Sequence, residues 1–545
     1  MIFSSVSREH ILGEMASRTY DLLIIGGGIT GAGIALDAAV RGIRTALIEM
    51  NDFASGTSGR STKLVHGGLR YLQNGEIKEV AELGKERAIV YQNGPHVTTP
   101  IWMLLPIHKG GPFGKWSTKA GLTLYDILAR VQKEERKKML TAREALAEEP
   151  LLKEDGLLGA GKYVEYRTDD ARLTIEVMKT SAQKGADVIN YVKMESFIYN
   201  HENKISGVRA KDQLNNRILD IKAKTVINAS GPWVDDVRSI DRAIDQNKKQ
   251  LKLSKGIHLV FDQLKFPLRH AVYFDAPDGR LIFAIPRDNK TYVGTTDTFY
   301  NGDPAIPKAG EEDRGYLLSC IRHFFPEIKL TMEDIESSWA GVRPLISEEG
   351  KSASEISRKD EIWESASGLI TIAGGKLTGY RKMAERAVNI AVKRLKALGH
   401  GPYGPGSTKT CTLSGGDMND LDQLITHYEQ KSGAFGLSQQ EGRYIASKYG
   451  SNAGVLFNWA LEAGSASDRL LYAEVMYALY DEMAVSPSDF FIRRTGDLYF
   501  NIQRVYTSKD LAIKWMGQAL GWSEEEKRAY DAELIKYVNE AAGKA

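Results

Sequence analysis

The stretch DLLIIGGGITGAGIALDAAVRGIRTALIEM, residues 21–50, decides the fold. Its opening segment, DLLIIGGG, is an apolar run that ends in glycines, which predicts a buried strand. Apolar residues at helical spacing follow and stop at Gly42, and TALIEM then predicts a second buried strand that ends close to Glu49. A strand, a helix and a strand in this order predict two parallel strands joined by a right-handed crossover.

The glycines after the first strand fit the pattern G-x-G-x-x-G. Gly26 permits a tight turn, Gly28 lets the backbone approach a pyrophosphate, and Gly31 lets the helix pack closely on the strand. The pyrophosphate would lie at the N-terminus of the helix, where unpaired N–H groups and the dipole favour negative charge. The motif therefore indicates a dinucleotide site, although it does not separate FAD from NAD. Its candidate residues are Gly26, Gly28, Ile29, Thr30 and Gly31.

Glu49 closes the second strand at the distance expected for a residue that binds ribose. A carboxylate there accepts hydrogen bonds from ribose hydroxyls and repels a 2′-phosphate, so NADP is disfavoured. Two later segments, TVINASGPWV (225–234) and GLITIAGG (368–375), predict strands that return to the same sheet. Flavoproteins often begin with such a unit and carry a substrate domain inserted later.

The middle of the chain has a different pattern. LKLSKGIHLVFDQL (251–264) and RLIFAIPRDNKTYVGTTDT (280–298) alternate apolar and polar residues, which predicts antiparallel strands of a second, inserted sheet. Residues 399–418 are rich in Gly, Pro, Ser and Thr and predict a linker. The chain beyond the linker has mostly helical patterns.

The bulk properties exclude several classes of protein. The formal net charge of +2 over 545 residues gives no global field for nucleic acid. Cys320 and Cys411 are the only two cysteines and form no CxxC pattern, so we expect no disulfide framework, no zinc site and a reducing, cytoplasmic location. No apolar run approaches the roughly 20 residues that span a bilayer. The first 20 residues carry charges throughout, which predicts a short helix and no signal peptide.

Four further motifs carry a resemblance. NDFASGTSGRSTKLVHGGLRYLQ (51–73), INASGPWVDDV, WAGVRPLI and IAGGKLTGYRKMAE are similar to motifs of the FAD-dependent glycerol-3-phosphate dehydrogenases, in the group that includes D-amino-acid oxidase and glycine oxidase. The resemblance runs over residues 20–395 and continues more loosely through FFIRRTGDLYF, with Gly379 where the family usually has a second Thr. It implies FAD, oxidation of sn-glycerol 3-phosphate to dihydroxyacetone phosphate, and a membrane quinone as electron acceptor.

The predicted fold class is α/β: a Rossmann-like FAD-binding domain, an inserted substrate domain with a mainly antiparallel sheet, and a C-terminal helical domain. The FAD-binding domain is predicted in three parts, 1–90, 151–240 and 336–398. The substrate domain is predicted in two parts, 91–150 and 241–335. The linker at 399–418 and the helical domain at 419–545 follow.

The resemblance and the local patterns together predict further cofactor contacts. Hydroxyls near the first strand–helix unit, a backbone contact to adenine at Val192, and the helix that follows residues 374–378 all belong to this set. The N-terminus of that helix, with Lys376, is expected to stabilise negative charge at the N1/C2=O edge of the reduced flavin. The residues are Ser58, Ser61, Thr62, His66, Gly67, Gly68, Val192, Gly231, Gly375, Lys376, Leu377 and Thr378.

A phosphorylated substrate calls for several cations, because guanidinium groups bind phosphate oxygens bidentately. The resemblance implies Arg70, Tyr71, Arg343, Arg358 and Lys376 as substrate-binding residues. An amine oxidase for a neutral amino acid would need one arginine, so the excess favours phosphate. His258 is our candidate for the catalytic proton acceptor, since the ordinary histidine pKa of about 6.5 suits that task. Arg343 is expected to polarise the developing carbonyl.

Several alternatives stay open at this point. The chain could instead be the related oxidase that reduces O₂ to H₂O₂, an NAD-linked dehydrogenase, or a non-catalytic dinucleotide-sensing protein. Residues 100–119 mix apolar and aromatic side chains with Lys109, Lys115 and Lys119, which fits either a peripheral membrane face or a core strand followed by a solvated helix. Oligomeric state is also open, and a homo-oligomer is compatible with the sequence.

Overall fold

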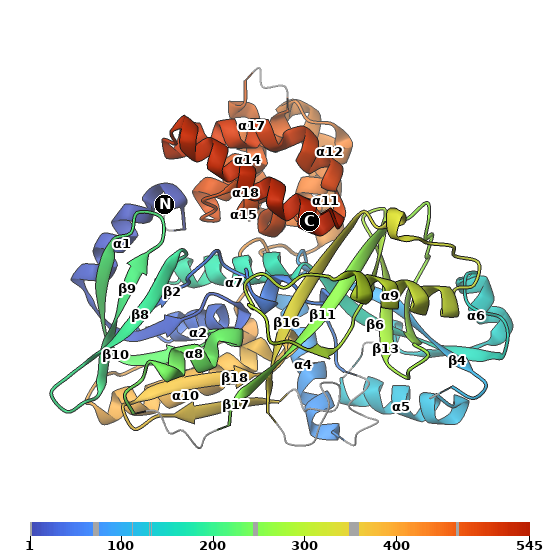
Figure 1. Ribbon diagram of the computed structural model, residues 1–545, viewed down its shortest axis with the longest axis horizontal. Helices are drawn as coiled ribbons and strands as arrows, with labels where there is room; N and C mark the ends of the chain where they lie inside the picture. Colours follow the sequence, from blue (N-terminus) through green and yellow to red (C-terminus); the bar gives the residue numbers. More distant parts are fainter. Residues whose placement is uncertain are drawn as a thin grey trace.

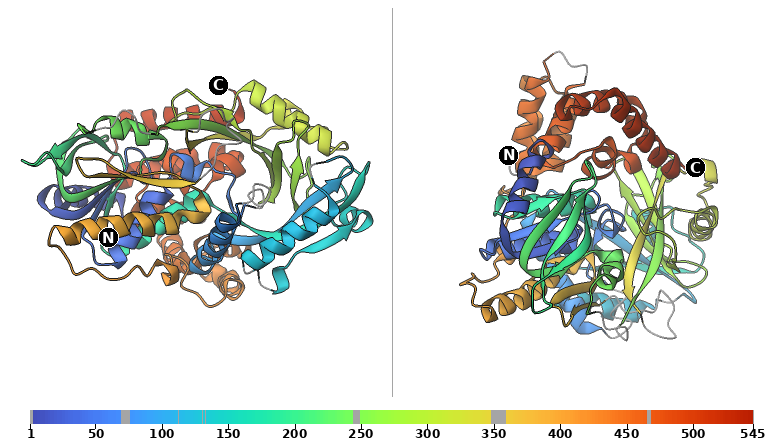
Figure 2. Two further views of the ribbon diagram at one scale, coloured as in Figure 1. Left: turned by 90° about the horizontal axis from the view of Figure 1, so that it is seen from below. Right: turned by 60° about the vertical axis from the view of Figure 1, so that its left-hand side comes forward.

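The structure is a computed structural model, and it describes residues 3–68, 76–111, 113–129, 131, 133–243, 249–347, 359–464 and 468–544. Two β-sheets lie next to each other, and a group of C-terminal helices lies over one end of both sheets (Figure 1). Figure 2 shows the same arrangement from two further directions. The predicted fold class is confirmed.

The first sheet has eight strands and contains the predicted strand–helix–strand unit. β1 (Thr19–Ile25) pairs in parallel with β2 (Thr45–Ile48) on one side and with β10 (Ile218–Asn228) on the other. β18 (Leu369–Gly374) pairs in parallel with β10, so both predicted later strands do return to this sheet. The other members are β7 (Asp187–Ile189), β8 (Val192–Tyr199), β9 (Ile205–Asp212) and β17 (Asp360–Glu364).

Helices cover this sheet because their apolar faces need burial. The helix between β1 and β2, α2 (Ile29–Val40), has a row of small buried residues that lets it pack against its neighbours. The short N-terminal helix predicted from sequence is α1 (Arg8–Ser17), which contacts β7 and β10. The remaining helices here are α7 (Asp170–Gln183), α8 (Val234–Ser239) and α10 (Tyr380–Ala397).

The second sheet has ten strands and is mainly antiparallel, as predicted. β12 pairs in parallel with β4, while the other pairings between its described strands are antiparallel. The strands are β3 (Leu64–Val65), β4 (Thr98–His108), β5 (Lys138–Thr141), β6 (Leu157–Thr168), β11 (Leu251–Asp262), β12 (Ala271–Asp275), β13 (Leu281–Arg287), β14 (Lys290–Gly294), β15 (Thr298–Phe299) and β16 (Ser337–Ile346).

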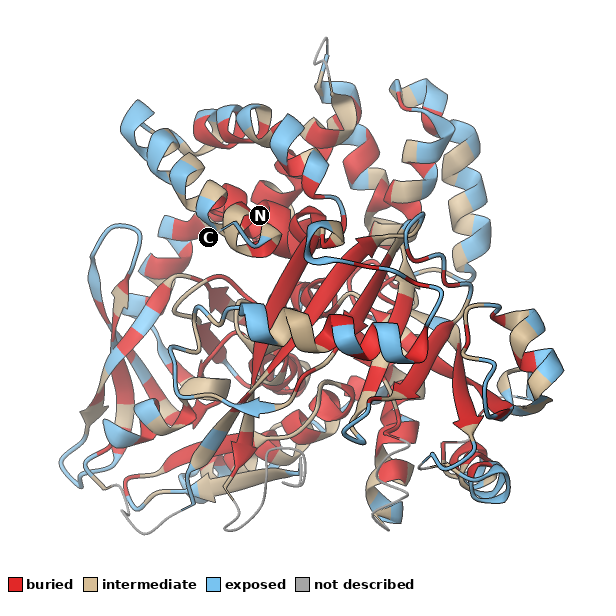
Figure 3. Ribbon diagram, turned by 45° about the vertical axis from the view of Figure 1, so that its right-hand side comes forward, coloured by how far each residue is buried: buried red, intermediate tan, exposed pale blue. Residues whose placement is uncertain are grey.

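Four helices accompany the second sheet: α4 (Ile77–Asn93), α5 (Lys115–Leu128), α6 (Ala142–Glu148) and α9 (Glu311–Phe324). α9 places Leu317, Ile321 and Phe324 in one buried cluster with residues of β11 to β14. Figure 3 shows the result, with buried strands and with helices that alternate between buried and exposed positions.

Three strands pair differently from the predicted division of the chain. β6 lies beside β4, β16 lies beside β11 and the short β3 lies beside β6, so all three belong to the second sheet. The prediction had assigned residues 1–90, 151–240 and 336–398 to the FAD-binding domain. β6 and β16 form long antiparallel ladders, and hydrogen bonding in these ladders places them in the second sheet. The other boundaries stay predictions.

Residues 399–418 carry little regular structure but are not a loose linker. Leu413 N donates to the carbonyl of Asn93 at 2.8 Å, and Ser414 N donates to the hydroxyl of Thr180 at 2.8 Å. Thr408 is buried and hydrogen bonds to Asp37. The segment is therefore held against α2, α4 and α7 by hydrogen bonds of its main chain and of the Thr408 side chain, which a composition rich in Gly, Pro, Ser and Thr does not reveal.

The C-terminal region is helical, as predicted. Three of its helices begin with capping boxes, Ser438 with Glu441, Ser486 with Asp489 and Ser523 with Glu526, which satisfy main-chain N–H groups at the helix start. The helices are α11 (Leu421–Lys431), α12 (Gln439–Tyr449), α13 (Ala453–Glu462), α14 (Arg469–Asp481), α15 (Pro487–Asp489), α16 (Asp497–Phe500), α17 (Ile502–Leu520) and α18 (Glu524–Ala542).

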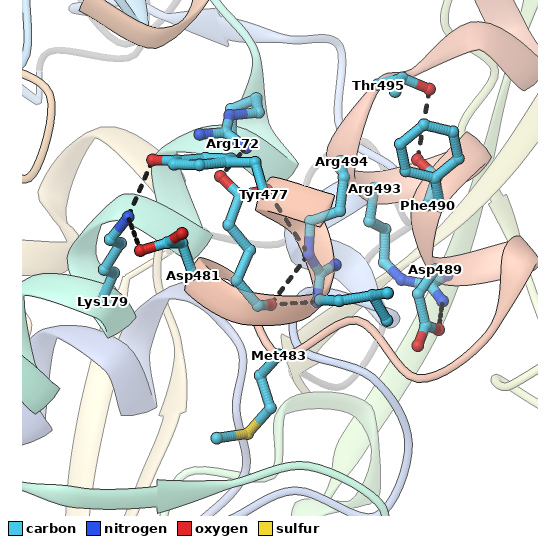
Figure 4. A network of polar contacts seen from close by, with 12 residues as sticks. Arg172, Lys179, Tyr477, Asp481, Met483, Asp489, Phe490, Arg493, Arg494 and Thr495 are labelled. Atoms are coloured by element: carbon cyan, nitrogen blue, oxygen red, sulfur yellow. Dashed lines mark hydrogen bonds and ion pairs between the residues drawn. The ribbon is translucent and has the colours of Figure 1, made fainter. Parts of the chain in front are cut away.

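Buried ion pairs connect the helical region to the first sheet (Figure 4). Arg172 on α7 pairs with Glu176 and with Glu482, and Lys179 donates to the hydroxyl of Tyr477 at 2.8 Å. Arg494 pairs with Asp52 just beyond β2 at 2.7 Å. Buried charges are costly unless they are paired, so these pairs fix how the helical region sits on the cofactor side.

Candidate active site

A cavity of about 630 Å³ lies between the two sheets. One part of its wall comes from the glycine loop after β1, the end of β2 and the turn after β10. The opposite part comes from β11, β13 and β16 of the second sheet and from the turn after β18. A concave site with mixed apolar and polar lining at the junction of two sheets is the expected form of a cofactor and substrate site.

The glycine loop has the geometry that the motif predicts. Gly26 has φ of +113°, and a Cβ there would come within 2.6 Å of a main-chain carbonyl oxygen. Gly28 lines the cavity with its backbone, and the hydroxyl of Ser58 accepts from Ile29 N at 2.9 Å. A Cβ at Gly31 would overlap the carbonyl of Gly26, so Gly31 serves the packing of α2 and does not line the cavity.

Glu49 lines the cavity and also holds the glycine loop in place. Its carboxylate accepts from Gly27 N at 2.6 Å and from Asn51 N at 2.9 Å, while Val192 N donates to the Glu49 carbonyl at 2.7 Å. Burial raises the pKa of the Glu49 carboxyl group. A carboxylate has further lone pairs, so binding of ribose by Glu49 stays a prediction that the geometry allows.

Two predicted cofactor hydroxyls are already engaged within the protein. The Ser61 hydroxyl donates to Asp170 at 2.7 Å, and Asp170 also pairs with Lys63. The Thr62 hydroxyl lies 3.0 Å from Nε2 of His258. Both side chains line the cavity, so they can offer lone pairs to a ligand.

The segment from His66 to Gly68 runs along the cavity wall. His66 and Gly68 line the cavity, whereas the Gly67 N–H points toward Tyr125 and Glu165. Contact of Gly67 with the cofactor stays a prediction. The other predicted residues that line the cavity are Thr30, Val192, Gly231, Gly375, Lys376, Leu377 and Thr378.

Arg343 projects into the second-sheet side of the cavity. Its guanidinium group donates to the Thr295 hydroxyl at 3.0 Å and lies 3.4 Å from the Asp297 carboxylate. Lys376 also lines the cavity, with Nζ 3.6 Å from Glu79. Arg70, Tyr71 and Arg358 lie outside the described residues, so their predicted roles are untested.

The cavity holds further charged residues that sequence reasoning missed. Arg60, Lys193, Arg280 and Glu165 all contribute to its wall. Arg280 immediately precedes β13 and pairs with Asp278. Each of the four stands in a segment with an ordinary alternating or turn pattern, so no local signal distinguishes it from a surface charge.

His258 lies on β11, and its side chain is 1% exposed. The ring stacks on Trp339, with centroids 4.6 Å apart, and Gly294 of the neighbouring strand packs directly against it. Burial, with the charge of Arg343, lowers the pKa of His258 well below 6.5, so the imidazole is neutral. Thr62 lies between His258 and the cavity, and contact of His258 with the substrate stays a prediction.

The residues present fit FAD. A glycine loop that lets the backbone approach a ligand, the N-terminus of α2 capped by Gly28, and Glu49 at the end of β2 form a dinucleotide cradle that continues into the rest of the cavity. The fold and the site define an FAD-dependent oxidoreductase, and residues 21–381 match the family described as "FAD dependent oxidoreductase". This excludes the NAD-linked and non-catalytic alternatives.

The comparison with known proteins narrows the class. The chain is 56% identical to the aerobic glycerol-3-phosphate dehydrogenase of Staphylococcus aureus strain USA300, covering 99% of this chain and 98% of that protein. The chain belongs to the family of FAD-dependent glycerol-3-phosphate dehydrogenases. A solved glycerol-3-phosphate dehydrogenase from Bacillus halodurans, complexed with FAD, is 47% identical, with a TM-score of 0.85 over 99% of both chains.

Two further matches concern parts of the chain. Residues 406–527 match the family described as "C-terminal domain of alpha-glycerophosphate oxidase". Glycine oxidase from Geobacillus kaustophilus is 20% identical, with a TM-score of 0.53 over 69% of this chain and 95% of that one, and therefore shares the fold alone.

Proposed function

We propose that this protein oxidises sn-glycerol 3-phosphate to dihydroxyacetone phosphate and passes the electrons to a membrane quinone. The observation that carries the proposal is the presence of Arg280, Arg343 and Lys376 in one cavity with the dinucleotide cradle. Asp297 lies 3.4 Å from the Arg343 guanidinium group, and Asp278 pairs with Arg280. Guanidinium groups grouped in this way suit a phosphate. The substrate in the names of the relatives supports the same assignment.

Bound FAD supplies the hydride acceptor, N5 of the flavin ring. The protein has to hold the phosphate, polarise the C2 oxygen and take the hydroxyl proton. The Thr62 hydroxyl lies at the cavity wall beside His258, and its proton can pass to the neutral Nε2 of His258 as Thr62 receives the substrate proton. A weak base suffices, because the substrate hydroxyl becomes strongly acidic as the hydride leaves.

The test is anaerobic reduction of the protein-bound flavin. We expect sn-glycerol 3-phosphate to bleach the absorption near about 450 nm, while glycerol, which lacks the phosphate, does not. Arg343→Ala should raise the half-saturating substrate concentration about tenfold to a hundredfold, because hydrogen bonds to a charged group are lost. Arg209→Ala is the matched control, since Arg209 is an exposed arginine paired with Asp220. Equal bleaching by glycerol, or an unchanged Arg343→Ala, would contradict the proposal.

The electron acceptor needs its own test, because the family description for residues 406–527 names an oxidase. The dehydrogenase names of the relatives favour a quinone. We expect the reduced protein to be reoxidised quickly by a short-chain quinone and slowly by air. Fast reoxidation in air with stoichiometric H₂O₂ would establish the oxidase instead.

A quinone acceptor requires a membrane face, and we propose the outer side of α5. Residues 100–108 are excluded, because they lie in β4, a core strand paired with β6. On α5, Trp116 is 82% exposed and Ile127 is 67% exposed, with Lys115 and Lys119 exposed beside them. Apolar and basic side chains together suit an anionic lipid interface.

The position of α5 agrees with this role. It lies at the end of the molecule opposite the C-terminal helices (Figure 1). No helix in the described part of the chain combines the length and apolar character needed to cross a bilayer. We therefore propose peripheral attachment at the cytoplasmic face of the membrane.

A further inference from the structure

Three buried polar side chains from three separate elements meet at the cavity wall beside Gly67. They are Arg87 on α4, Tyr125 on α5 and Glu165 on β6, exposed by 2%, 1% and 3%. The Tyr125 hydroxyl donates to Glu165 Oε1 at 2.8 Å, and Arg87 Nη1 donates to Tyr125 Oη at 2.8 Å and to Glu165 Oε2 at 3.0 Å. We refer to these three residues as the Arg87 cluster.

The cluster holds a main-chain group of the cavity wall. Gly67 N lies 3.2 Å from the Tyr125 hydroxyl and 3.3 Å from Glu165 Oε2. Gly67 follows the end of β3, so it has no strand partner, and its buried N–H needs an acceptor. A Cβ at Gly67 would come within 2.6 Å of the Tyr125 ring, so the segment lies directly against the cluster.

The Arg87 cluster contains buried charged and polar groups that are not needed to fill the space between the elements. Burial raises the pKa of Glu165, while Arg87 and Tyr125 act in the opposite direction. Arg87 is fixed further by the carbonyl of Val164 at 2.8 Å and by the ring of Tyr166. Apolar residues of the same volume would stabilise such an interior at least as well. A polar group is needed here because an apolar one cannot accept the Gly67 hydrogen bond.

The residues on either side of Gly67 line the cavity, and so does Glu165 itself. We infer that Arg87, Tyr125 and Glu165 act as positioning residues that fix the main chain of His66 to Gly68 at the flavin side of the cavity. The inference rests on the proposed function, because that function identifies the flavin as the group next to residues 66–68. It assigns to these residues a role through Gly67, without contact to the substrate.

The same cluster connects the cavity to the exposed helix. Tyr125 is nine residues after Trp116, so the two side chains point to opposite faces of α5. Ile127 is eleven residues after Trp116 and points to the same face as Trp116. One face of α5 is therefore exposed and apolar, and the opposite face carries the hydroxyl that binds Gly67.

The test uses the full-length FAD-loaded protein with Tyr125→Phe. The matched control is Tyr449→Phe, because Tyr449 is also a buried tyrosine that donates to a buried glutamate, Glu474, at 3.0 Å, but lies in the C-terminal helices. We expect similar shifts in Tm for the two variants. Hydrogen exchange over residues 64–68 should become about tenfold faster in Tyr125→Phe only.

A second readout concerns the flavin. Tyr125→Phe should alter the visible flavin spectrum and lower the limiting rate of anaerobic reduction about fivefold or more, with little change in the half-saturating substrate concentration. Glu165→Gln, which keeps an acceptor for Gly67, should fall between Tyr125→Phe and wild type. Unchanged exchange over residues 64–68 in Tyr125→Phe would overturn the inference.

The two proposals fail separately. If glycerol 3-phosphate does not reduce the wild-type flavin, the proposed function is wrong, but the exchange and spectral measurements still decide whether the cluster positions the segment. If wild type is reduced and Tyr125→Phe behaves as Tyr449→Phe does in every readout, the positioning role is wrong and the proposed function stands.

Discussion

The hydroxyl of Thr378 holds the main chain of His66 in both directions. It accepts from His66 N at 3.1 Å and donates to the His66 carbonyl at 3.0 Å, across 312 residues of sequence. Thr378 follows β18 of the first sheet, whereas His66 follows β3 of the second. The Thr378–His66 pair therefore joins the two sheets at the cavity wall. The Arg87 cluster holds the next residue, Gly67, through its N–H group.

Thr378→Val should weaken FAD binding. Valine keeps the shape but removes both hydrogen bonds, so two part-buried main-chain groups of His66 lose their Thr378 partner. We expect about a tenfold higher dissociation constant for FAD, measured by flavin fluorescence in a titration of the apoprotein. Thr378→Ser retains the hydroxyl and should bind FAD as wild type does. Equal affinity for Thr378→Val and Thr378→Ser would show that the contact does not organise the cofactor site.

The proton path predicts linked behaviour of Thr62 and His258. If the substrate proton reaches His258 through Thr62, Thr62→Val should lower the limiting rate of anaerobic flavin reduction about a hundredfold. His258→Asn should have a similar effect, and the double variant should lose little more, because both act in one path. Thr62→Ser keeps the hydroxyl and should retain most of the rate. Additive losses in the double variant would argue for two independent roles.

The pH profile of the same rate gives a separate check. Burial and the charge of Arg343 lower the pKa of His258, so the neutral, proton-accepting form persists as pH falls through the ordinary value of about 6.5. The wild-type rate of flavin reduction should therefore not fall near pH 6.5 through protonation of His258. The wild type and His258→Asn should have pH profiles of the same shape in that range. Stopped-flow reduction between about pH 5.5 and 8 measures this. A decline centred near 6.5 in wild type, absent from His258→Asn, would mean that His258 is solvated during turnover.

The position of His258 shows what sequence patterns do not predict: which side chains of a fully buried strand face a cavity. The strand–helix–strand unit was predictable because apolar runs, glycines and helical spacing each have one local cause. β11, in contrast, is buried continuously over residues 256–261, so its alternation does not tell which side chains face the cavity. The prediction placed His258 on the correct strand, whereas the position of its ring between Trp339 and Thr62 became evident only from the structure.

The Arg87 cluster was unpredictable for a different reason. Arg87, Tyr125 and Glu165 each stand in an unremarkable helix or strand, and their meaning arises only where α4, α5 and β6 converge behind Gly67. The same holds for Arg280, which joins Arg343 only through the pairing of β13 with its neighbours. Residues of one motif could be found from sequence, whereas sites assembled from separate elements needed the tertiary structure.

The exposed face of α5 predicts binding to lipid. Trp116→Ser with Ile127→Ser should reduce cosedimentation with anionic vesicles about tenfold or more, because exposed apolar area at the interface is lost. Leu264→Ser is the control, since Leu264 is 92% exposed on a turn elsewhere in the second-sheet region. Flavin reduction by glycerol 3-phosphate in solution should be unchanged in both proteins. If Leu264→Ser reduces vesicle binding as strongly, the binding is a non-specific effect of exposed apolar side chains and α5 is not the membrane face.

Asp52 links the C-terminal helices to the cofactor side of the first sheet. Its carboxylate accepts from Arg493 at 2.5 Å, from Arg494 at 2.7 Å and from Asn190 at 3.0 Å, and it is fully buried three residues after Glu49. Burial alone would raise the pKa of Asp52, but Arg494 and Arg493 lower it to about 2. Asp52→Asn removes the carboxylate that both arginines share and leaves Arg493 with Asp489 alone, so we expect a loss of about 3–5 kcal/mol in the free energy of unfolding at pH 7.

The pH dependence of that loss has a definite sign. An aspartate in the unfolded chain has a pKa of about 3.9, so the stabilisation by the ionised Asp52 is complete above about pH 4 and disappears as pH falls from about 4 toward 2. The difference in urea midpoint between wild type and Asp52→Asn should therefore be constant from neutral pH down to about pH 4 and narrow below it. Asp220→Asn, which removes an exposed partner of Arg209, should change the midpoint little at any pH. A difference that already narrows between pH 7 and pH 5 would mean that the arginines do not hold Asp52 ionised, and that other contacts join the helices to the cofactor side.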